Sequence, residues 1–448
     1  MAEARARISL PAGAPTARLF PSAAGQHLLV VPFSRIYDVA PGPGDVEGFD
    51  PEDAAASLLD RSLGDVDLDV VPEPSPQSIS LNVSSSCNLT CGYCYAARGN
   101  FGGAQATPMA WETARAAIDR LIAGADASAP ITIGFLGGEP FVNRKLIHRA
   151  VSYGAAEAAR RGLDIRYSVT TNGTLLEAED IELMRRRPFA VTVSLDGGAS
   201  VQDRARPRWG DKTGTFDSIV ERIAPLLSWP GRARVAARAT VTRNDFDLTG
   251  RLDALLGLGF PEVGFAPLRV GPPGSGALSD DDWPAYFEAL VAVARLELER
   301  FKRGMPIRLT NLATALKQLH RGASLPYPCG AGGGYFSVSA EGIWYACHRA
   351  IGNPDFELGS NEGLDAARRR AFLQARHVHA QTDCSVCWAR YLCSGGCHQE
   401  AKSRSAASCD FIRSWLDFCL AAYCGLDVSP PGAAPDFTTS PPVEAMTP

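Results

Sequence analysis

From residue 78 to about residue 270 the chain alternates short apolar segments with longer amphipathic ones, and this alternation limits the folds that it can adopt. The segments with strand character are residues 79–83, 131–136, 164–169, 190–195, 234–241 and 263–267. Helical patterns lie between them, for example over residues 108–124 and 143–162, and a further one covers residues 281–303. Six strands that alternate with helices predict an α/β fold with a parallel sheet or a partial barrel. Such folds bind their ligands at the carboxyl ends of the strands.

Composition and charge exclude several classes of partner. The 448 residues allow about three domains. The formal net charge of −5 gives no general attraction to nucleic acid or to an anionic membrane. No apolar run approaches the roughly 20 residues of a membrane-spanning helix, and the first residues, MAEARARISLPAGAP, lack the apolar core of a signal peptide. We therefore expect a cytoplasmic protein without a nucleic-acid or membrane partner.

The cysteines are distributed unevenly. Three lie at positions 87, 91 and 94, none lies between residues 95 and 328, seven lie between residues 329 and 409, and Cys419 and Cys424 follow. In a reducing compartment the 12 cysteines are expected to be metal ligands rather than disulfides. The distribution predicts two metal-binding regions separated by a cysteine-free body.

The first cysteine group, CNLTCGYC, directly follows the first predicted strand and has the spacing C-x3-C-x2-C. Three thiolates on one loop can hold three irons of a 4Fe–4S cluster and leave the fourth iron open. A zinc site would need a fourth ligand, and no histidine lies nearby in the sequence. A redox pair would need only two cysteines.

Glycine-containing and polar motifs end the next three strands: FLGGEP at residues 135–140, SVTTNGT at 168–174 and SLDGG at 194–198. Each alone is ordinary turn composition. In this order after C-x3-C-x2-C, however, they resemble the motifs of radical S-adenosylmethionine (SAM) enzymes. The resemblance implies a partial (β/α)6 radical SAM barrel and a 4Fe–4S cluster on Cys87, Cys91 and Cys94. SAM itself would chelate the open iron of that cluster.

The resemblance also implies a set of contacts to SAM. Gly137 and Gly138 would let the backbone approach its methionine part, and Glu139 would accept a hydrogen bond from its ammonium group. The remaining implied cofactor-site residues are Tyr93, Thr171, Asn172, Ser194, Asp196 and Arg206. In this family a reduced cluster passes an electron to SAM, and the resulting 5′-deoxyadenosyl radical abstracts a hydrogen atom from an unactivated carbon.

The second cysteine region resembles a SPASM domain, the extension found in radical SAM enzymes that modify peptides and proteins. Its elements are Cys329, Gly342, Cys347, a C-x2-C-x5-C-x3-C run over residues 384–397, and Cys409. A zinc ribbon is the alternative, although only one C-x2-C knuckle is present. The resemblance implies two auxiliary 4Fe–4S clusters, one on Cys384, Cys387, Cys393 and Cys409 and the other on Cys329, Cys347 and Cys397.

The second of these clusters lacks an identified fourth ligand. Cys419 and Cys424 are candidates, but an apolar stretch such as SWLDFCLAAYC is more typical of buried packing residues. An open iron would be able to bind a substrate thiolate instead.

The residue after Cys347 indicates a particular branch of the family. Sulfatase-maturating enzymes carry an aspartate there, which acts as their catalytic base. This chain has His348 instead, which argues against formylglycine synthesis. The CHR sequence and the motif-bearing region resemble cross-linking peptide maturases, including quinohemoprotein amine dehydrogenase maturation proteins. His348 is therefore a candidate catalytic proton acceptor or, alternatively, a hydrogen-bond donor to the cluster sulfurs.

We expect four parts along the chain. They are a small α+β unit at residues 1–75, the radical SAM barrel at 78–305, the SPASM domain at 325–425 and a disordered tail at 429–448. The first unit has strand character at residues 27–39 and a helix pattern at 50–63. It either captures a leader peptide by strand addition or simply caps the barrel.

The leading hypothesis is a radical SAM maturase that forms a thioether or carbon–carbon cross-link in a ribosomally made peptide or protein subunit. An alternative enzyme would oxidise or epimerise a side chain without a cross-link. A non-catalytic iron–sulfur electron carrier is the alternative from another class. Either enzyme hypothesis requires SAM, three 4Fe–4S clusters and an electron donor such as flavodoxin or ferredoxin.

Overall fold

The computed structural model describes residues 12–41, 48–62, 74–101, 107–228, 233–322, 325–426 and residue 437. The expected tail at residues 429–448 lies outside the described residues, except for Phe437. That side chain is buried, and its ring packs against Phe301, with ring centroids 5.7 Å apart. Residues 71–78, VPEPSPQS, are rich in proline and precede the first strand of the predicted barrel, and the structure describes residues 74–78 of them.

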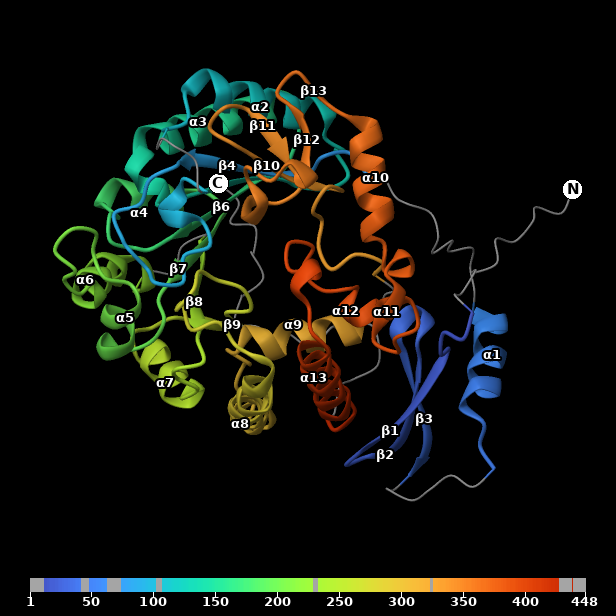
Figure 1. Ribbon diagram of the computed structural model, residues 1–448. Coiled ribbons are helices and arrows are strands. Elements are labelled where there is room, and N and C mark those ends of the chain that lie inside the picture. The colour runs from blue at the N-terminus through green and yellow to red at the C-terminus, as the bar shows by residue number, and fades with distance from the viewer. Residues whose placement is uncertain are drawn as a thin grey trace, which may run out of the picture.

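Six parallel strands form the centre of the molecule (Figure 1). They are β4 (Ser78–Ser84), β5 (Ile131–Gly137), β6 (Ile165–Thr171), β7 (Phe189–Ser194), β8 (Arg234–Val241) and β9 (Glu262–Pro267), and they neighbour one another in this order. Each lies within two residues of the predicted bounds. The α/β fold class with a parallel sheet is therefore confirmed.

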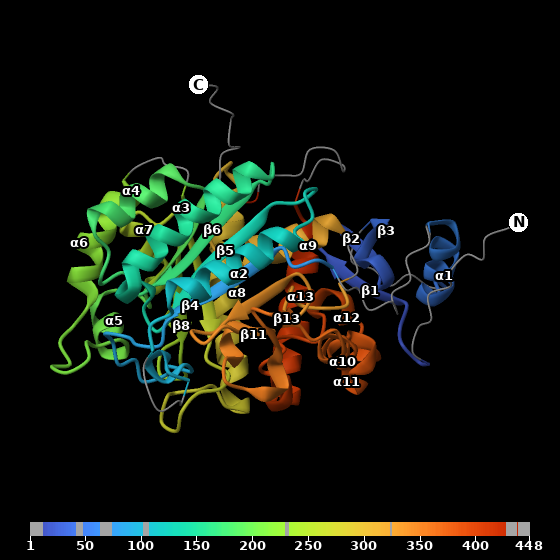
Figure 2. The ribbon, with the colours of Figure 1, turned by 90° about the horizontal axis from the view of Figure 1, so that it is seen from above.

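Helices cover the outer face of this sheet. They are α2 (Trp111–Gly124), α3 (Arg144–Arg160), α4 (Ala178–Arg186), α5 (Ala199–Ala205), α6 (Phe216–Leu227), α7 (Leu248–Gly257), α8 (Trp283–Lys302) and α9 (Thr310–Arg321). In Figure 2, α2, α3 and α4 lie over one face of the strands, and the C-terminal elements lie on the other side. On β4 the apolar Ile79, Leu81 and Val83 are completely buried in the core. Alternation along the strand therefore directs Ser80 and Asn82 to the inner face.

The cysteine-rich C-terminal region continues the central sheet. Strand β10 (Tyr335–Val338) pairs in parallel with β4, and β11 (Ile343–Tyr345), β12 (Glu357–Ser360) and β13 (Gly363–Leu364) follow in antiparallel order. Helices α10 (Ala366–Arg376), α11 (Thr382–Ser385), α12 (Arg390–Cys393) and α13 (Ala406–Cys424) complete it. The sequence predicted short strands here. It did not predict that they extend the barrel sheet beyond β4.

The N-terminal unit is a three-stranded antiparallel sheet with one helix. Its elements are β1 (Ala17–Ser22), β2 (Gly25–Val30), β3 (Arg35–Pro41) and α1 (Pro51–Ser62). The sequence indicated the other three elements but not β1. Leu28 and Val30 pack with Ala55 of α1, whereas Leu29 belongs to the main core. Alternate residues of β2 therefore join the unit both to its own helix and to the rest of the molecule.

A salt bridge also holds this unit in place. Arg18 of β1 forms an ion pair with Asp417 of α13 at 2.9 Å, and its guanidinium lies over the ring of Trp388. Figure 1 shows the unit beside α12 and α13. Among the described helices, none is both long and apolar enough to span a bilayer.

Candidate functional site

Cys87, Cys91 and Cys94 lie on the loop that follows β4, and all three are partly buried. Burial raises the pKa of Cys87 to about 12 and also raises that of Cys91. The Cys91 charge adds to the rise at Cys87, and the Cys94 charge adds to the rise at Cys91. Thiols in such a place stay protonated unless a metal binds them, because a cation stabilises the thiolate.

The glycines of the GGEP motif let two loops approach closely. A Cβ on Gly137 would overlap the carbonyl oxygen of Ser84, and one on Gly138 would overlap that of Ser86. The amides of Gly138 and Glu139 donate to these two oxygens at 2.8 and 2.9 Å. The two glycines thus fasten the end of β5 to the cysteine loop. Their predicted approach to SAM stays a prediction.

Glu139 is completely buried among donors from neighbouring strand ends. Its carboxylate accepts from the Thr171 hydroxyl at 2.7 Å, from the Asn172 amide at 2.7 Å and from the Phe141 amide at 3.1 Å. Burial nevertheless raises the pKa of Glu139 to about 7. Thr171 and Asn172, which were predicted to contact the cofactor, therefore also orient this carboxylate.

The Asn172 side chain connects β6 to the cysteine loop. Its Nδ2 donates to Asn88 Oδ1 at 3.0 Å and lies 3.8 Å from Cys87 Sγ. Asn88 in turn donates to the Thr174 hydroxyl at 2.8 Å. Sequence reasoning missed Asn88, although its position directly after the first cysteine was an available signal.

Tyr93, Asp196 and Arg206 form a buried cluster at the same strand ends. The Tyr93 hydroxyl donates to Asp196 Oδ2, and Arg206 Nη1 donates to the Tyr93 oxygen at 2.7 Å. Asp196 Oδ1 also accepts from the Thr240 amide at 2.8 Å. The buried Arg206 Nε has no hydrogen-bond partner within the part of the chain that the structure describes. A buried donor without a partner is a position where a ligand oxygen fits.

Ser194 is the last residue of β7 and is half-buried. The structure thus brings the predicted SAM-site residues to neighbouring strand ends. Their roles as ligands stay predictions.

The second cysteine region contains two groups of sulfurs. Cys384, Cys387, Cys393 and Cys409 line one cavity of about 270 Å³. Cys329, Cys347 and Cys397 form the other group. Burial raises the pKa of Cys329 and Cys347, and the Cys397 charge raises both further. These are the two ligand sets implied by the resemblance. In neither set, nor in the first cysteine loop, do three sulfurs among the described residues lie within 4.8 Å of one another. Tetrahedral zinc–thiolate sites place their sulfurs about 3.8 Å apart. None of the three sets of described cysteines therefore has the sulfur spacing of such a zinc site.

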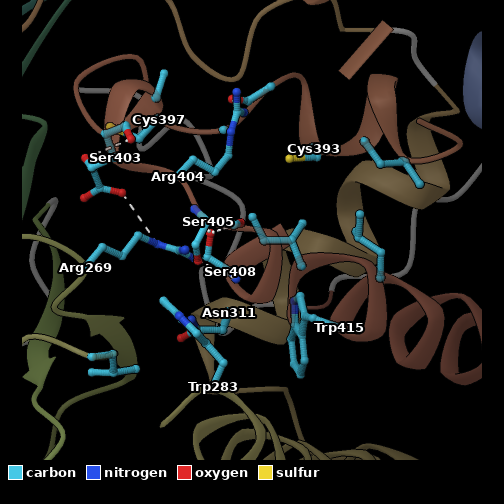
Figure 3. A pocket seen from close by; sticks show the side chains of 18 of the residues that line it. Arg269, Trp283, Asn311, Cys393, Cys397, Ser403, Arg404, Ser405, Ser408 and Trp415 are labelled. Carbon is cyan, nitrogen blue, oxygen red and sulfur yellow. Dashed lines mark hydrogen bonds and ion pairs between the residues drawn. The ribbon is translucent and has the colours of Figure 1, made fainter. Parts of the chain in front are cut away.

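A larger cavity of about 470 Å³ lies between the two groups and is lined by Cys393 and Cys397. Figure 3 shows these two cysteines along one edge of it, with Trp283 and Trp415 on the opposite side. Cys419 is completely buried in the main core on α13. Burial, with a smaller contribution from the Asp38 charge, raises the pKa of Cys424 to about 12. Both positions agree with packing residues.

His348 begins the short helical turn that follows β11 and lies at the end of a chain of hydrogen bonds. Its Nδ1 is 2.9 Å from the Tyr335 hydroxyl, which is 2.7 Å from the Ser80 hydroxyl of β4. Burial and the nearby Arg349 charge lower the pKa of His348 to about 4, so the imidazole is neutral at pH 7.

Tyr95 and Arg349 join the first cysteine loop to the second cysteine region. The Arg349 guanidinium lies 5.2 Å from the centre of the Tyr95 ring. Both the Cys94 and the Cys347 charges act on the Tyr95 hydroxyl. Arg349 also lies with its Nη1 3.8 Å from Cys397 Sγ. Sequence reasoning missed Tyr95 in this role, because the contact joins residues about 250 positions apart.

Comparison with known proteins identifies the family. Residues 81–226 match the family model of the Radical SAM superfamily. This part of the chain is a radical SAM domain. A serine-type anaerobic sulfatase-maturating enzyme from Klebsiella aerogenes is 27% identical over 75% of this chain and 83% of that protein. An uncharacterized Archaeoglobus fulgidus protein is 25% identical over 85% and 87% of the two chains.

Solved structures share the fold of the enzyme. The structure described as native anSMEcpe with bound AdoMet has a TM-score of 0.65 at 20% identity, and it covers 78% of this chain and 99% of its own. Streptococcus suis SuiB bound to precursor peptide SuiA has a TM-score of 0.51 at 12% identity, with 88% and 97% covered. At these identities the likeness establishes the fold.

A radical SAM domain implies SAM and one 4Fe–4S cluster, and the residues present fit both. Cys87, Cys91 and Cys94 supply three soft ligands on one loop. The unpartnered Arg206 Nε and the enclosed Glu139 carboxylate supply a donor and an acceptor for an amino acid group. The placement of the SAM-binding cluster on this loop stays a prediction.

Proposed function

We propose that the enzyme is a maturase that forms an intramolecular cross-link, a thioether or a carbon–carbon bond, in a ribosomally made peptide or protein subunit. The observation that carries the proposal is the contact of Tyr95 with Arg349, beside Cys94 on one side and Cys347 on the other. A substrate carbon that reacts at the strand ends would therefore lie near the second cysteine region.

The relatives support a peptide or protein substrate. Sulfatase-maturating enzymes match over most of both chains, and SuiB, which shares the fold, is described in complex with a precursor peptide. We propose that Cys384, Cys387, Cys393 and Cys409 hold one auxiliary 4Fe–4S cluster. Cys329, Cys347 and Cys397 would hold a second cluster whose open iron accepts a substrate thiolate.

The chain's own residues bind and orient the cofactor in this proposal. When bound, SAM and its cluster supply a hydrogen-abstracting 5′-deoxyadenosyl radical after one-electron reduction by a donor such as flavodoxin or ferredoxin. Glu139 would accept a hydrogen bond from the SAM ammonium group, and Arg206 would donate one to its carboxylate. A cross-link removes two hydrogens from the substrate. One would leave as an atom in 5′-deoxyadenosine and the other as a proton, and the auxiliary site would have to take up one electron.

We propose that the N-terminal unit binds a leader segment. In the described part of this unit, β3 pairs with β2 alone, so its outer edge is available for an added strand. Deleting residues 12–62 should then weaken the binding of a leader-containing substrate without changing SAM cleavage. Unchanged binding would leave the unit with a structural role only.

The test of the function uses enzyme purified and reconstituted without oxygen. SAM, a strong reductant and candidate peptides or subunits are added, and products are read by mass spectrometry. Cross-linking predicts 5′-deoxyadenosine together with a substrate that has lost two hydrogens and resists fragmentation into linear pieces. If 5′-deoxyadenosine forms while no peptide or subunit changes, the proposed substrate class is wrong. An unchanged substrate mass with inverted stereochemistry would indicate epimerisation.

SAM affinity should depend on pH through Glu139. The carboxyl has a pKa of about 7, so it is mostly protonated below pH 7 and mostly ionised above it. The protonated form is a poor acceptor for an ammonium group, whereas the ionised form is a good one. We expect affinity to rise as the pH increases toward 7, by up to about tenfold per pH unit, and to level off above it. Equilibrium dialysis at about pH 6 and about pH 8 measures this. Glu139→Gln should remove the dependence, and a flat profile for the unchanged enzyme would contradict it.

We propose that His348 accepts the substrate proton. If the Tyr335 hydroxyl donates to Ser80, the imidazole Nδ1–H donates to Tyr335 and Nε2 keeps a lone pair. His348→Asn keeps a group near Nδ1 but removes Nε2. It should lower cross-linked product about a hundredfold while SAM cleavage continues. If instead product formation persists and only the iron–sulfur spectrum shifts, His348 is a donor to the cluster.

A further inference from the structure

Trp209, on the loop that follows α5, is the most exposed large apolar side chain in the described part of the chain, with 56% of its surface accessible. Two cations lie over its ring. The Arg98 guanidinium is 3.3 Å from the ring centre, and Lys212 Nζ is 5.8 Å from it. Tryptophan and arginine are enriched among the residues that supply most of the binding energy at protein interfaces. This combination therefore indicates a surface that binds another protein.

The backbone holds both cations in unusual conformations. Arg98 and Lys212 are left-handed, with φ of 64° and 61°, although neither is a glycine. Such conformations persist only where the surrounding contacts fix them. Arg98 Nη2 lies 3.5 Å from the carbonyl oxygen of Cys87, and Lys212 Nζ lies 3.4 Å from the Thr90 hydroxyl. Contacts with the first cysteine loop thus hold both side chains beside the Trp209 ring.

Backbone hydrogen bonds also join this surface to the first cysteine loop. The Trp209 amide donates to the carbonyl oxygen of Asn88, the residue after Cys87, at 2.9 Å. The Arg98 amide donates to Cys94 Sγ at 3.4 Å. Arg98 therefore contacts a proposed cluster ligand through its backbone and Trp209 through its side chain. A protein bound over Trp209 would have one residue, Arg98, between it and Cys94.

The charge of this surface is opposite to that of the whole chain. Among the described residues, no carboxylate forms an ion pair with Arg98 or Lys212, whose polar contacts go to the first cysteine loop. The next charges in the sequence, those of Arg208 and Asp211, are of opposite sign, and the Asp211 carboxylate accepts from Thr213 within its own turn. The chain has a formal net charge of −5. An acidic protein is thus repelled by the chain in general and attracted here.

We propose that Arg98, Trp209 and Lys212, which we call the Trp209 patch, dock an acidic protein that donates one electron to the SAM-binding cluster. The donor would lose one electron, and the cluster would gain it. The inference rests on the SAM-binding cluster of the proposed function and does not depend on which bond the substrate forms. Electron-transfer partners use small, transient interfaces in which charge speeds association, and a patch of this size agrees with that.

The first test measures binding without turnover. Reconstituted enzyme is titrated with oxidised flavodoxin, an acidic protein, at ionic strengths of about 0.05 and about 0.3 M, without reductant. We expect Trp209→Ala to raise the Kd about tenfold or more, because a central tryptophan is lost. Arg98→Gln and Lys212→Gln should each raise it about threefold to tenfold at the lower ionic strength, and less at the higher one. Isothermal titration calorimetry gives each Kd.

Lys302→Gln is the matched control for the charge. Lys302 is also exposed, with 54% of its side chain accessible, and its replacement changes the net charge by the same amount. It ends α8, however, close to the turn where the Val263 amide, near the start of β9, donates to the carbonyl oxygen of Arg308. That turn lies at the amino end of the strand, away from the first cysteine loop. The Kd for flavodoxin should therefore be unchanged in this variant.

A second test locates the bound donor on the surface. A carbodiimide joins a donor carboxylate to a lysine amine as an amide, with loss of water. The chain has only five lysines, at positions 145, 212, 302, 317 and 402. We expect Lys212 to give most of the cross-links to flavodoxin, as read by mass spectrometry of the digested complex. Lys212→Arg keeps the charge but cannot form the amide, so it should lose the cross-link and keep the Kd within about twofold.

The outcome for SAM cleavage separates docking from damage to the cluster. With titanium(III) citrate, a small reductant, the yield of 5′-deoxyadenosine and the iron content should be the same in all variants. With reduced flavodoxin the yield should fall about tenfold in Trp209→Ala. An unchanged Kd in Trp209→Ala, or cross-links mainly at other lysines, would overturn the inference and leave the proposed function intact.

Three other results would contradict the inference in different ways. Weaker peptide binding in Trp209→Ala with an unchanged Kd for flavodoxin would assign the Trp209 patch to the substrate. If neither flavodoxin nor an acidic ferredoxin binds the unchanged enzyme, the patch does not dock such a donor. If titanium(III) citrate gives no SAM cleavage in the unchanged enzyme, the assignment of the SAM-binding cluster fails, and the inference fails with it.

Discussion

Replacing Cys91 with alanine is expected to reduce SAM cleavage to background and to lower the iron content by about four atoms per chain. The reason is the ligand count of the first cysteine loop, where Cys87 and Cys94 alone would remain. Those thiols are partly buried, and without iron they stay protonated. Iron analysis and the yield of 5′-deoxyadenosine from reduced, reconstituted protein measure the two effects.

The control for this variant is a cysteine outside all three groups. Cys419 is completely buried in the core on α13, so Cys419→Ala should keep the iron content and SAM cleavage. It should lower the free energy of unfolding by only about 1 kcal/mol, since it removes one small apolar group. If the Cys91→Ala variant still cleaves SAM, the assignment of the SAM-binding cluster to this loop is wrong.

Replacing Cys397 with alanine should abolish the cross-link without abolishing SAM cleavage. Cys397 acts electrostatically on both Cys329 and Cys347, so its loss should also remove about four irons per chain. The first cysteine loop keeps all its ligands, and 5′-deoxyadenosine should still form. The substrate, however, would lose both the thiolate-binding iron and the electron acceptor that the second step requires.

Mass spectrometry of the substrate separates the outcomes for Cys397→Ala. The expected result is 5′-deoxyadenosine without the loss of two hydrogens from the substrate. A normal yield of cross-linked product would exclude the Cys329, Cys347 and Cys397 set from the reaction. Loss of SAM cleavage together with the cross-link would indicate that the two regions fold as one unit, which thermal unfolding of the variant would reveal.

The strands of the barrel were predictable because their signal is local. A buried parallel strand needs a short apolar run, and each run is bounded by helix patterns and by polar turn residues. For the same reason the motifs at the strand ends were visible before the fold was known. The cysteine loop, Glu139, Asn172 and Asp196 each follow directly after a strand, and parallel strands bring their carboxyl ends to one edge.

The grouping of the auxiliary cysteines came from family resemblance, and the structure is consistent with it. Spacing alone does not assign Cys397 to one set and Cys393 to the other, because Cys393 is the last residue of α12 and Cys397 follows only four residues later. In the structure the turn after α12 separates them, with Ser394 in a left-handed conformation at φ 54°. Cys393 then lines the smaller cavity with Cys384, Cys387 and Cys409.

By itself, then, the sequence determined the six parallel strands, the two cysteine regions and the chemistry that thiolates and strand-end motifs imply. Only the tertiary structure decided which of these parts face one another. Strand β10 pairs with β4 across more than 250 residues, and this pairing brings Tyr335 and His348 to Ser80 and Arg349 to Tyr95. It also decided that Arg349 and Arg269 share Glu400. Such contacts depend on chain topology, and periodicity and spacing describe only neighbours along the chain.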